Sequence, residues 1–358
     1  MENEVAIIGA GPIGLVLGKE LAGRGIDVTI YDGKKEAGEH AERASGVVSA
    51  TGIEGTGMGY RDAVINELKG AFLISGNGRV TVRAETTKAY VLDRAKLARI
   101  FFKEAEAAGA RIRLGRRLGR EEIKGMEAAV VVGADGAAST TASAFGFPPL
   151  ERYVLTYKKT YRGRDLEREM AEVHFTSPTK GLFGWMIPYS EERLELGVGV
   201  DSKKGVTSLR AFNDFFELGG YDGLDADGDG RASMIPLMTR RRTAMGNVIL
   251  VGDAAGQVKS TTGGGIVFGS LCAKAGADAI ERHMKKGGKL TDYERIWRSR
   301  YGMELGLHNA IHALYSAMGQ RGMERFLRMA DAAGLGPFLS EYGDMDMPSK
   351  IIKRLIIR

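Results

Sequence analysis

The first 32 residues contain the pattern that most restricts the fold of this chain. An apolar run, Val5–Ile8, leads into the turn Gly9-Ala10-Gly11-Pro12-Ile13-Gly14, and a helical stretch then precedes a second apolar run that ends at Asp32. In such a unit the first glycine permits a tight turn, the second admits a pyrophosphate close to the backbone, and the third lets helix and strand pack closely. The helix N-terminus attracts the phosphates, and the acid accepts hydrogen bonds from a ribose. We therefore predict a dinucleotide site at Gly9, Gly11, Pro12, Gly14 and Asp32, with a purely structural glycine turn as the alternative.

A second glycine-rich segment lies far along the chain. The run Asn247–Val251 is typical of a buried strand, Gly252 and Asp253 follow it, and a small-residue helix is predicted from Gly264 to His283. A nicotinamide enzyme would leave this segment without a role, whereas FAD also needs groups that hold its ribityl chain and isoalloxazine. The segment therefore favours FAD, with Gly252, Asp253 and the flavin-proximal residues Thr261, Thr262, Gly263, Gly264, Gly265 and Ile266 as candidate contacts.

A third signal allows a comparison with a known family. The strand of the segment 130–140, VVVGADGAAST, ends at Asp135-Gly136, and Arg94 lies in the segment YVLDRAKL. In this order the segments resemble those of p-hydroxybenzoate-hydroxylase-like flavoproteins, from Val5 to about Trp297. Within that group, GDAAGQVKSTTGGGI is very similar to the geranylgeranyl reductase family, which saturates the prenyl chains of archaeal lipids and chlorophyll precursors.

The resemblance implies roles for individual residues around FAD. Asp253 is expected to bind the ribityl chain, and Arg94 to approach the phosphates or the flavin edge, with a solvated helix arginine as the alternative. Asp135 and Gly136 are expected beside the cofactor in a structural role. The segment RASGVVS places Ala44, Ser45 and Gly46 near the flavin, although many relatives have a cysteine where this chain has Ala44.

The substrate side is matched less closely. The segment GLFGWMIP resembles the family motif PxxYxWxFP, which lines the substrate cavity, and it retains Trp185 and Pro188. Phe183 takes the place of the motif tyrosine, so that a polar contact is lost while the wall stays apolar. We take Phe183, Trp185 and Pro188 as candidate substrate contacts, with an ordinary buried aromatic strand as the alternative.

The chain is long enough for a discontinuous cofactor domain. A Rossmann-like FAD-binding domain is predicted from residues 1–70, 88–150 and 240–290, and an inserted antiparallel-sheet substrate domain from 71–87 and 151–239. Residues 291–358 are predicted to form a helical C-terminal region. The Gly76-Asn77-Gly78 turn predicts a hairpin, and Asp93 predicts an N-cap for a helix that ends near Ala108.

The resemblance implies an FAD-dependent reductase acting on C=C bonds, with a hydride delivered from N5 of the reduced flavin. The sequence does not identify a proton donor. The substrate would be a prenyl lipid or a prenyl diphosphate, and an external electron donor, ferredoxin or NADPH, would be required. An aromatic hydroxylase of the same superfamily is the alternative, and a flavin electron-transfer protein is a third hypothesis.

Composition restricts the setting. A single cysteine, Cys272, excludes an internal disulfide, and no apolar run has the length of a membrane-spanning helix, so that we expect a cytoplasmic enzyme. The net charge of +6 favours anionic partners, but no nucleic-acid-binding motif accompanies it. The segment MPSKIIKRLIIR at 347–358 could form an amphipathic helix on the inner membrane surface, or a short helix docked on the protein.

The sequence contains two further charge clusters. Asp225–Gly230 imitates the start of an EF-hand, but Pro236 stands where the loop requires a glutamate, and we expect no metal site. Arg240, Arg241, Arg242 and Lys259 could meet a substrate phosphate at the cavity mouth, with a solvated strand entry as the alternative.

Overall fold

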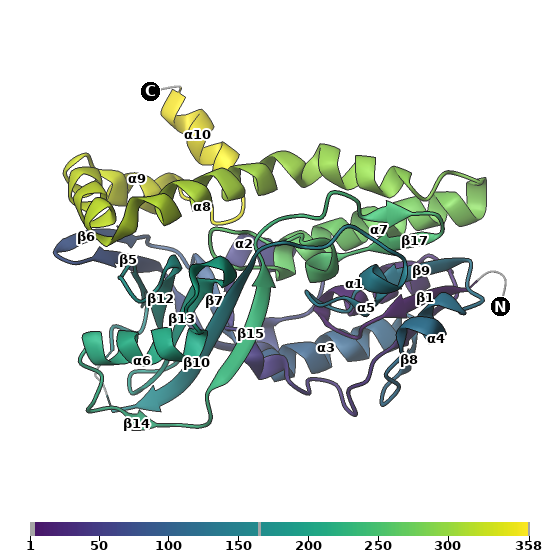
Figure 1. Ribbon diagram of the computed structural model, residues 1–358, viewed down its shortest axis with the longest axis horizontal. Helices are drawn as coiled ribbons and strands as arrows, with labels where there is room; N and C mark the ends of the chain where they lie inside the picture. The colour runs from purple at the N-terminus through teal and green to yellow at the C-terminus, as the bar shows by residue number, and fades with distance from the viewer. Residues whose placement is uncertain (1–3, 164–165, 357–358) are drawn as a thin grey trace.

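The computed structural model describes residues 4–163 and 166–356. Its first sheet is a six-stranded, mainly parallel sheet in the order β16-β17-β9-β1-β2-β8, with β16 antiparallel at one edge (Figure 1). The strands are β1 (Val5–Ile8), β2 (Val28–Tyr31), β8 (Arg111–Arg113), β9 (Val130–Gly133), β16 (Ala244–Met245) and β17 (Val248–Leu250). Strands β1 and β17, which are far apart in the sequence, therefore lie in one sheet on either side of β9.

Helices cover both faces of this sheet because the buried strand residues alternate between the faces. Val5 and Ile7 belong to a cluster that also contains residues of α1 (Pro12–Gly23), α3 (Arg94–Ala107) and α7 (Ile266–Lys286). Ile8 faces the other side, with α4 (Arg120–Lys124) and α5 (Thr140–Ala144). A side chain at Gly269 of α7 would collide with Ile13, so that the small residue permits close packing of α7 against α1.

The second sheet has eight strands, in the order β14-β10-β13-β12-β11-β5-β6, with β15 also pairing with β10. Its pairs are antiparallel except for β11 with β5. The bounds are β5 (Gly70–Ser75), β6 (Gly78–Arg83), β10 (Tyr153–Arg162), β11 (Met170–His174), β12 (Gly181–Pro188), β13 (Arg193–Asp201), β14 (Asp225–Ala226) and β15 (Arg231–Pro236). Helix α6 (Ser208–Leu218) packs on one face through Phe212 and Phe215.

A three-stranded sheet packs near the opposite face of β12. It contains β3 (Val47–Ser49), β4 (Val64–Leu68) and β7 (Ala89–Leu92), and its residues Leu68 and Val91 form a cluster with Trp185 and Ile187 of β12. Helix α2 (Ala50–Gly55) follows β3, and the short 3₁₀ helices are η1 (Ala41–Arg43), η2 (Arg61–Ala63), η3 (Ser202–Lys204) and η4 (Gly252–Ala255).

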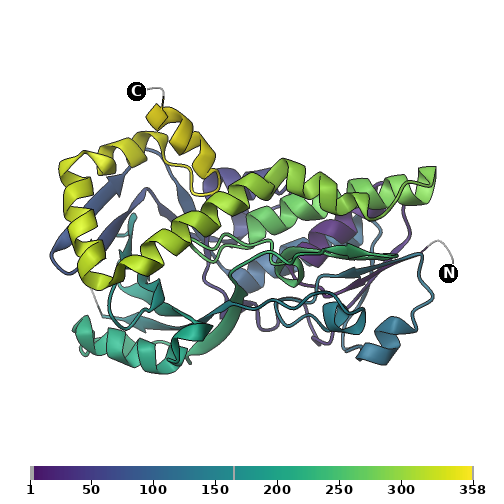
Figure 2. The same cartoon turned by 45° about the horizontal axis from the view of Figure 1, so that its top comes forward.

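The C-terminal region is helical and connects the two large sheets. Helix α8 (Asp292–Ala332) packs on α7 and reaches β5 and β6, and it runs along the top of the molecule in Figure 1. Its backbone is interrupted at Gly319, where φ is 62° and ψ is 174°. Helices α9 (Leu335–Tyr342) and α10 (Pro348–Ile356) fold back, as Figure 2 shows from a second direction.

The predicted fold class is confirmed: a parallel FAD-binding-type sheet, an antiparallel sheet and a helical C-terminal region are all present. The predicted hairpin is β5–β6, and Asp93 caps α3 by accepting a hydrogen bond from the backbone N of Lys96 at 2.9 Å. The predicted domain boundaries remain a prediction. Among the described residues, no helix combines the length and the apolar character needed to cross a bilayer.

The acidic segment that imitates an EF-hand is part of the second sheet. Asp225 and Ala226 form β14, which pairs with β10, and the carboxylate of Asp227 accepts a hydrogen bond from Arg193 Nε at 2.5 Å. Arg162 also lies within ion-pair distance of Asp227. These guanidinium groups hold the pKa of Asp227 below its ordinary value. The role of Asp227 in this structure is therefore that of an ion-pair partner for arginine.

Candidate cofactor and substrate site

Two of the three glycines of the first turn lie where a side chain would collide with the backbone, and the third faces open space. Gly9 has a φ of +112°, and a Cβ there would lie 2.3 Å from the carbonyl O of Ala134. A Cβ at Gly14 would lie 2.0 Å from the carbonyl O of Gly9, whereas at Gly11 it would meet no atom within 4 Å. The space beside Gly11, at the N-terminus of α1, is the place where a pyrophosphate would approach the backbone.

Asp32 lies at the end of β2 and supports this turn. Its Oδ2 accepts a hydrogen bond from the backbone N of Ala10 at 2.7 Å, and its Oδ1 accepts one from the backbone N of Lys34 at 2.9 Å. The acid therefore fixes the conformation of the glycine turn, in addition to the predicted contact with a ribose.

Arg94 and Asp253 come together from distant parts of the sequence. Burial lowers the pKa of Arg94 to about 10, an effect that the charge of Asp253 opposes. Burial raises the pKa of Asp253 to about 6, and Arg94 opposes that shift in turn. Arg94 Nε is buried and has no hydrogen-bond partner among the described residues. A buried donor of this kind is costly unless a ligand satisfies it, so this pair fits a polar cofactor.

The glycine-rich loop before α7 borders the same pair. A Cβ at Gly265 would lie 2.8 Å from Asp253 Oδ1, and Gly263, with a φ of +74°, donates a backbone hydrogen bond to the carbonyl O of Lys259 at 2.7 Å. Gly252, with a φ of +62°, donates its backbone N–H to Gln257 Oε1 at 2.9 Å. The loop thus places Gly264, Gly265 and the start of α7 at Ile266 close to Asp253 and Arg94.

The structure also shows that α8 and the segment before α10 hold this loop, which the sequence did not predict. His308 Nε2 lies 3.1 Å from the carbonyl O of Asp346, which can only accept, so that Nε2 carries a proton. In the neutral ring, whose pKa burial lowers, Nδ1 then accepts from the Thr261 hydroxyl at 2.7 Å. Tyr315 OH donates to the carbonyl O of Thr261 at 3.1 Å. Thr261 is therefore fixed by α8.

The segment that contains Ala44 borders the same region. A Cβ at Gly46 would lie 2.4 Å from the carbonyl O of Leu92, only two residues before Arg94. Ser45 Oγ accepts a weak hydrogen bond from the backbone N of Val47 at 3.4 Å, and the carbonyl O of Ala44 accepts one from Lys158 Nζ at 2.9 Å. Residues 44–46 therefore lie between the Arg94 region and the second sheet.

Asp135 organises the turn after β9. Its carboxylate accepts hydrogen bonds from Ser139 Oγ at 2.5 Å and from the backbone N and the hydroxyl of Thr141 at 2.8 and 3.0 Å. Gly136 has a φ of +80°. The preceding residue, Ala134, lies against Gly9, so this turn supports the glycine turn from the side.

The candidate substrate residues lie on β12. Phe183 and Trp185 pack edge to face with ring centroids 6.2 Å apart, and Trp185 is only 9% exposed. Trp185 Nε1 donates to Glu195 Oε1 at 2.8 Å, and the carbonyl O of Pro188 accepts from Asn66 Nδ2 at 2.9 Å. Sequence reasoning missed Glu195, although a charged residue among the apolar and glycine residues of RLELGVGVD was a usable signal.

Arg240 and Lys259, two of the candidate contacts for a substrate phosphate, bind other groups of the protein. Arg240 Nε donates to the carbonyl O of Ala254 at 2.6 Å, and its Nη1 donates to the carbonyl O of Pro148. Lys259 Nζ lies 2.5 Å from Asp346 Oδ1, and both side chains are almost fully buried. Their charges are therefore engaged inside the protein, whereas Arg241 and Arg242 are exposed.

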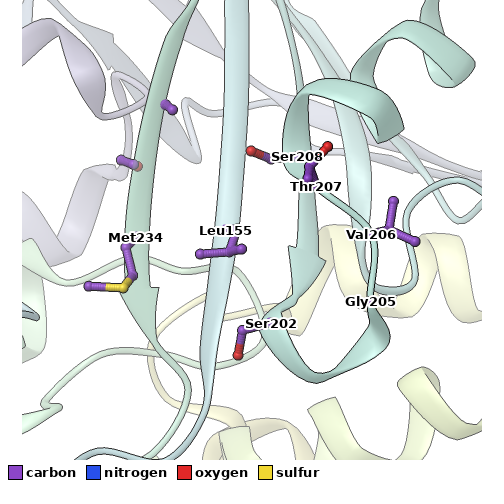
Figure 3. A pocket seen from close by; sticks show the side chains of 9 residues that line it. Leu155, Ser202, Gly205, Val206, Thr207, Ser208 and Met234 are labelled. Carbon is purple, nitrogen blue, oxygen red and sulfur yellow. The ribbon is translucent and has the colours of Figure 1, made fainter.

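A separate surface hollow of about 430 Å³ lies between β10, β15 and the segment before α6 (Figure 3). Leu155 and Met234 from the two strands and Ser202 line it together with residues 205–208. None of the predicted cofactor or substrate residues lines this hollow, so we do not assign it to the candidate site.

Residues 2–269 match the family model of the FAD binding domain, which is three quarters of the chain, so that the protein belongs to this family of flavoproteins. FAD is therefore its cofactor, as predicted. Among its relatives, digeranylgeranylglycerophospholipid reductase 2 of Methanothermobacter thermautotrophicus is 27% identical, over 94% of this chain and 93% of that protein. Digeranylgeranylglycerophospholipid reductase 1 of Methanopyrus kandleri is 28% identical, over 84% of this chain and 87% of that protein.

A solved structure supports the same architecture. A geranylgeranyl bacteriochlorophyll reductase-like protein from Thermoplasma acidophilum superposes with a TM-score of 0.83 at 17% identity, over 98% of this chain and 95% of that one. The similarity extends through the helical C-terminal region, where the sequence resemblance was loose. At this identity the comparison establishes the fold.

Proposed function

We propose that this protein is an FAD-dependent reductase that saturates C=C bonds in the geranylgeranyl chains of archaeal-type lipid precursors. The observation that carries the proposal is the similarity, over nearly the whole chain, to proteins named digeranylgeranylglycerophospholipid reductases. The apolar aromatic wall on β12 is compatible with a prenyl chain.

The residues of the site suit FAD in two groups. Gly9, Gly11, Pro12 and Gly14 would bind the pyrophosphate, and Asp32 the adenosine ribose. Arg94, Asp253 and the loop residues Gly264 and Gly265 would bind the ribityl and flavin part, next to Ala44, Ser45 and Gly46. When bound and reduced, FAD would supply a hydride from N5 to one carbon of the alkene, and a proton would be added to the other carbon.

An isolated alkene has no carbonyl that a hydrogen-bond donor could polarise, so the protein must act by positioning and by charge. Phe183 and Trp185 provide apolar surface for the chain. The backbone N–H groups around Gly263–Gly265 and the N-terminal end of α7 place positive potential beside Asp253. Helix α8 fixes the loop at Thr261.

Two parts of the proposal concern partners. Electrons would come from an external ferredoxin or NADPH. Helix α10 exposes Ile352, Lys353 and Arg354, a combination suited to an anionic membrane surface, whereas Ile357 and Arg358 lie outside the described residues. Deleting residues 347–358 is expected to weaken binding to anionic liposomes, and unchanged binding would remove the membrane part of the proposal.

The decisive experiment is an anaerobic turnover. The purified flavoprotein is reduced with dithionite and mixed with a geranylgeranyl phospholipid. The molecular mass of the lipid is then measured by mass spectrometry. Gains in steps of two hydrogens, together with reoxidation of the flavin, are expected. Unchanged lipid with a fully reduced flavin would contradict the proposal and favour the hydroxylase, which oxygen-dependent turnover of phenols would test.

A further inference from the structure

A buried ion pair lies on the second sheet. Its two residues are not among those assigned above to the cofactor or the substrate, but they contact some of them. Lys158 of β10 and Glu195 of β13 are separated by 2.6 Å, and their side chains are 10% and 0% exposed. In antiparallel strands Lys158 pairs with Gly197, two residues from Glu195, so that the two side chains meet diagonally on one face. This face is opposite to that of Tyr157, which packs on α6 through Phe212.

Glu195 accepts hydrogen bonds from residues on and directly after β12, the strand that carries the candidate substrate residues. Its Oε1 accepts from Trp185 Nε1 at 2.8 Å, and its Oε2 accepts from Tyr189 OH at 2.7 Å as well as from Lys158. A Cβ at Gly197 would lie 2.2 Å from the indole ring of Trp185, so that the ring lies directly over this glycine. The glycine leaves room for the ring of Trp185, and the carboxylate binds the ring at its edge.

Lys158 connects the same carboxylate to the cofactor side. Its Nζ donates to the carbonyl O of Ala44 at 2.9 Å. On the neighbouring strand β15, Ile235 lies on the same face of the sheet, and a Cβ at Gly263 would be 2.9 Å from its Cδ1. The face that carries Lys158 therefore touches both segments predicted to hold the flavin, 44–46 and 263–265.

A contribution to folding stability does not explain why these two buried residues are charged. A buried ion pair is often no more stabilising than apolar residues of the same volume, because both charges lose their hydration. An apolar pair would, however, provide neither the acceptor for Trp185 and Tyr189 nor the donor for Ala44. Both functions need a carboxylate and an ammonium group at these two positions.

From this geometry we infer that Glu195 and Lys158 are positioning residues, which set Trp185 of the substrate wall at a fixed place relative to the flavin-binding segment at Ala44. This inference rests on the proposed function, since it assigns Trp185 to the substrate wall. For an unactivated alkene, orientation against the flavin is a main source of rate, and a small displacement of the wall lowers the rate steeply. The bridge supplies that orientation without touching the substrate.

The first test observes Trp185 directly and does not depend on turnover. The chain has two tryptophans, so protein labelled with 5-fluorotryptophan gives two ¹⁹F resonances, which the variant Trp185→Phe assigns. Trp297 donates to Thr243 Oγ1 in the other core and serves as the internal control. In Glu195→Gln, in Lys158→Met and in the double variant, we expect the Trp185 resonance to shift and broaden while that of Trp297 stays in place.

Matched controls are available on the same strands. Glu192→Gln changes an exposed acid at the turn before β13, and Lys159→Met changes the next residue of β10, which lies over Tyr161. Neither control is expected to move the Trp185 resonance. The double variant leaves no uncompensated charge, so it keeps the test interpretable if a single variant fails to fold.

The second test separates positioning from a merely structural role. In folded variants we expect kcat for lipid reduction to fall roughly tenfold or more, and the visible spectrum of bound FAD to shift in Lys158→Met. An unchanged Trp185 resonance in all three variants would overturn the inference, and so would full kcat with a displaced resonance. If the wild-type protein does not reduce lipid, the proposed function fails, whereas the ¹⁹F result still reports on the bridge.

Discussion

Two pairs of opposite charge, one in each half of the molecule, differ in how completely their hydrogen-bonding groups are satisfied. Lys158 and Glu195 are in direct contact, and their remaining groups bind Ala44, Trp185 and Tyr189. Arg94 and Asp253 attract one another, but Arg94 Nε has no hydrogen-bond partner within the described chain. The comparison separates two uses of buried charge: the satisfied pair positions its neighbours, and the incomplete pair has capacity left for a ligand.

Breaking the satisfied pair is expected to have the largest effect on stability. Glu195→Ala leaves the Lys158 ammonium buried without its acid, which should lower the free energy of unfolding by about 3–5 kcal/mol. Lys158→Met with Glu195→Met should cost much less, because no charge is left unpaired. Urea unfolding of both variants, with Glu192→Ala as the exposed control, measures the difference. Equal losses in the single and the double variant would contradict this account.

Removing Arg94 should instead weaken the binding of FAD. Arg94→Met removes a charged donor that the protein leaves unsatisfied, and a hydrogen bond to a charged group is worth about 1.5–3 kcal/mol, which is roughly tenfold to more than a hundredfold in affinity. Arg99→Met, at an exposed position of α3, is the control. FAD titration by flavin fluorescence measures the affinity. Equal affinity in the two variants would show that Arg94 is not a cofactor ligand.

Asp253 should give the FAD-free protein a specific pH dependence. Its pKa in the folded chain is raised to about 6 from 3.8, so that the folded state binds this proton more tightly than the unfolded state. Stability therefore falls as the pH rises between these two values. The Asp253→Asn variant should not show this loss of stability. Its free energy of unfolding should exceed that of the wild-type protein by about 1–3 kcal/mol at pH 7 and should differ little from it at pH 4. Parallel urea curves at both pH values provide the measurement.

The smallest effect on stability is expected at Gly11. A Cβ there meets no atom within 4 Å, so Gly11→Ala should change the free energy of unfolding by less than about 1 kcal/mol while it obstructs the pyrophosphate. Gly14→Ala places a Cβ 2.0 Å from the carbonyl O of Gly9 and should destabilise by about 1–3 kcal/mol. Thermal unfolding and FAD titration of both variants separate the two roles, and a stable Gly11→Ala with unchanged FAD affinity would exclude the predicted contact.

The two halves also differ in what their sequences predict. The turn at Gly9–Gly14, the acid Asp253 after β17 and the N-cap Asp93 depend on residues close together in sequence, and the expected strands and helices are found around all of them. The family resemblance implied a place near FAD for Arg94 and for Asp253 separately, and their proximity to each other was not predicted. The physical reason is that local spacing specifies turns and caps, whereas strand order brings distant segments together.

Non-local contacts account for what the sequence did not predict. Lys158 contacts Glu195 because β10 pairs with β13 in one particular register. A shift of that register by one residue would place the two side chains on opposite faces of the sheet. Lys259 was a candidate contact for a substrate phosphate, but it is buried against Asp346, which lies in the segment between α9 and α10. His308 and Tyr315 reach Thr261 only because α8 crosses both halves. None of these contacts produces a sequence pattern that can be recognised in either of the two segments alone.

The contacts of Asp346 have a consequence for biosynthesis. Asp346 binds Lys259 and the hydroxyl of Ser49, and its carbonyl O accepts from His308, so that residues from four distant parts of the chain meet at one point. While residue 346 is still within the ribosome, Lys259 lacks its acid and His308 lacks its carbonyl acceptor. We therefore expect the nascent protein to acquire its FAD late, after almost all of these residues have emerged, even though the glycine turn at Gly9 is synthesised first.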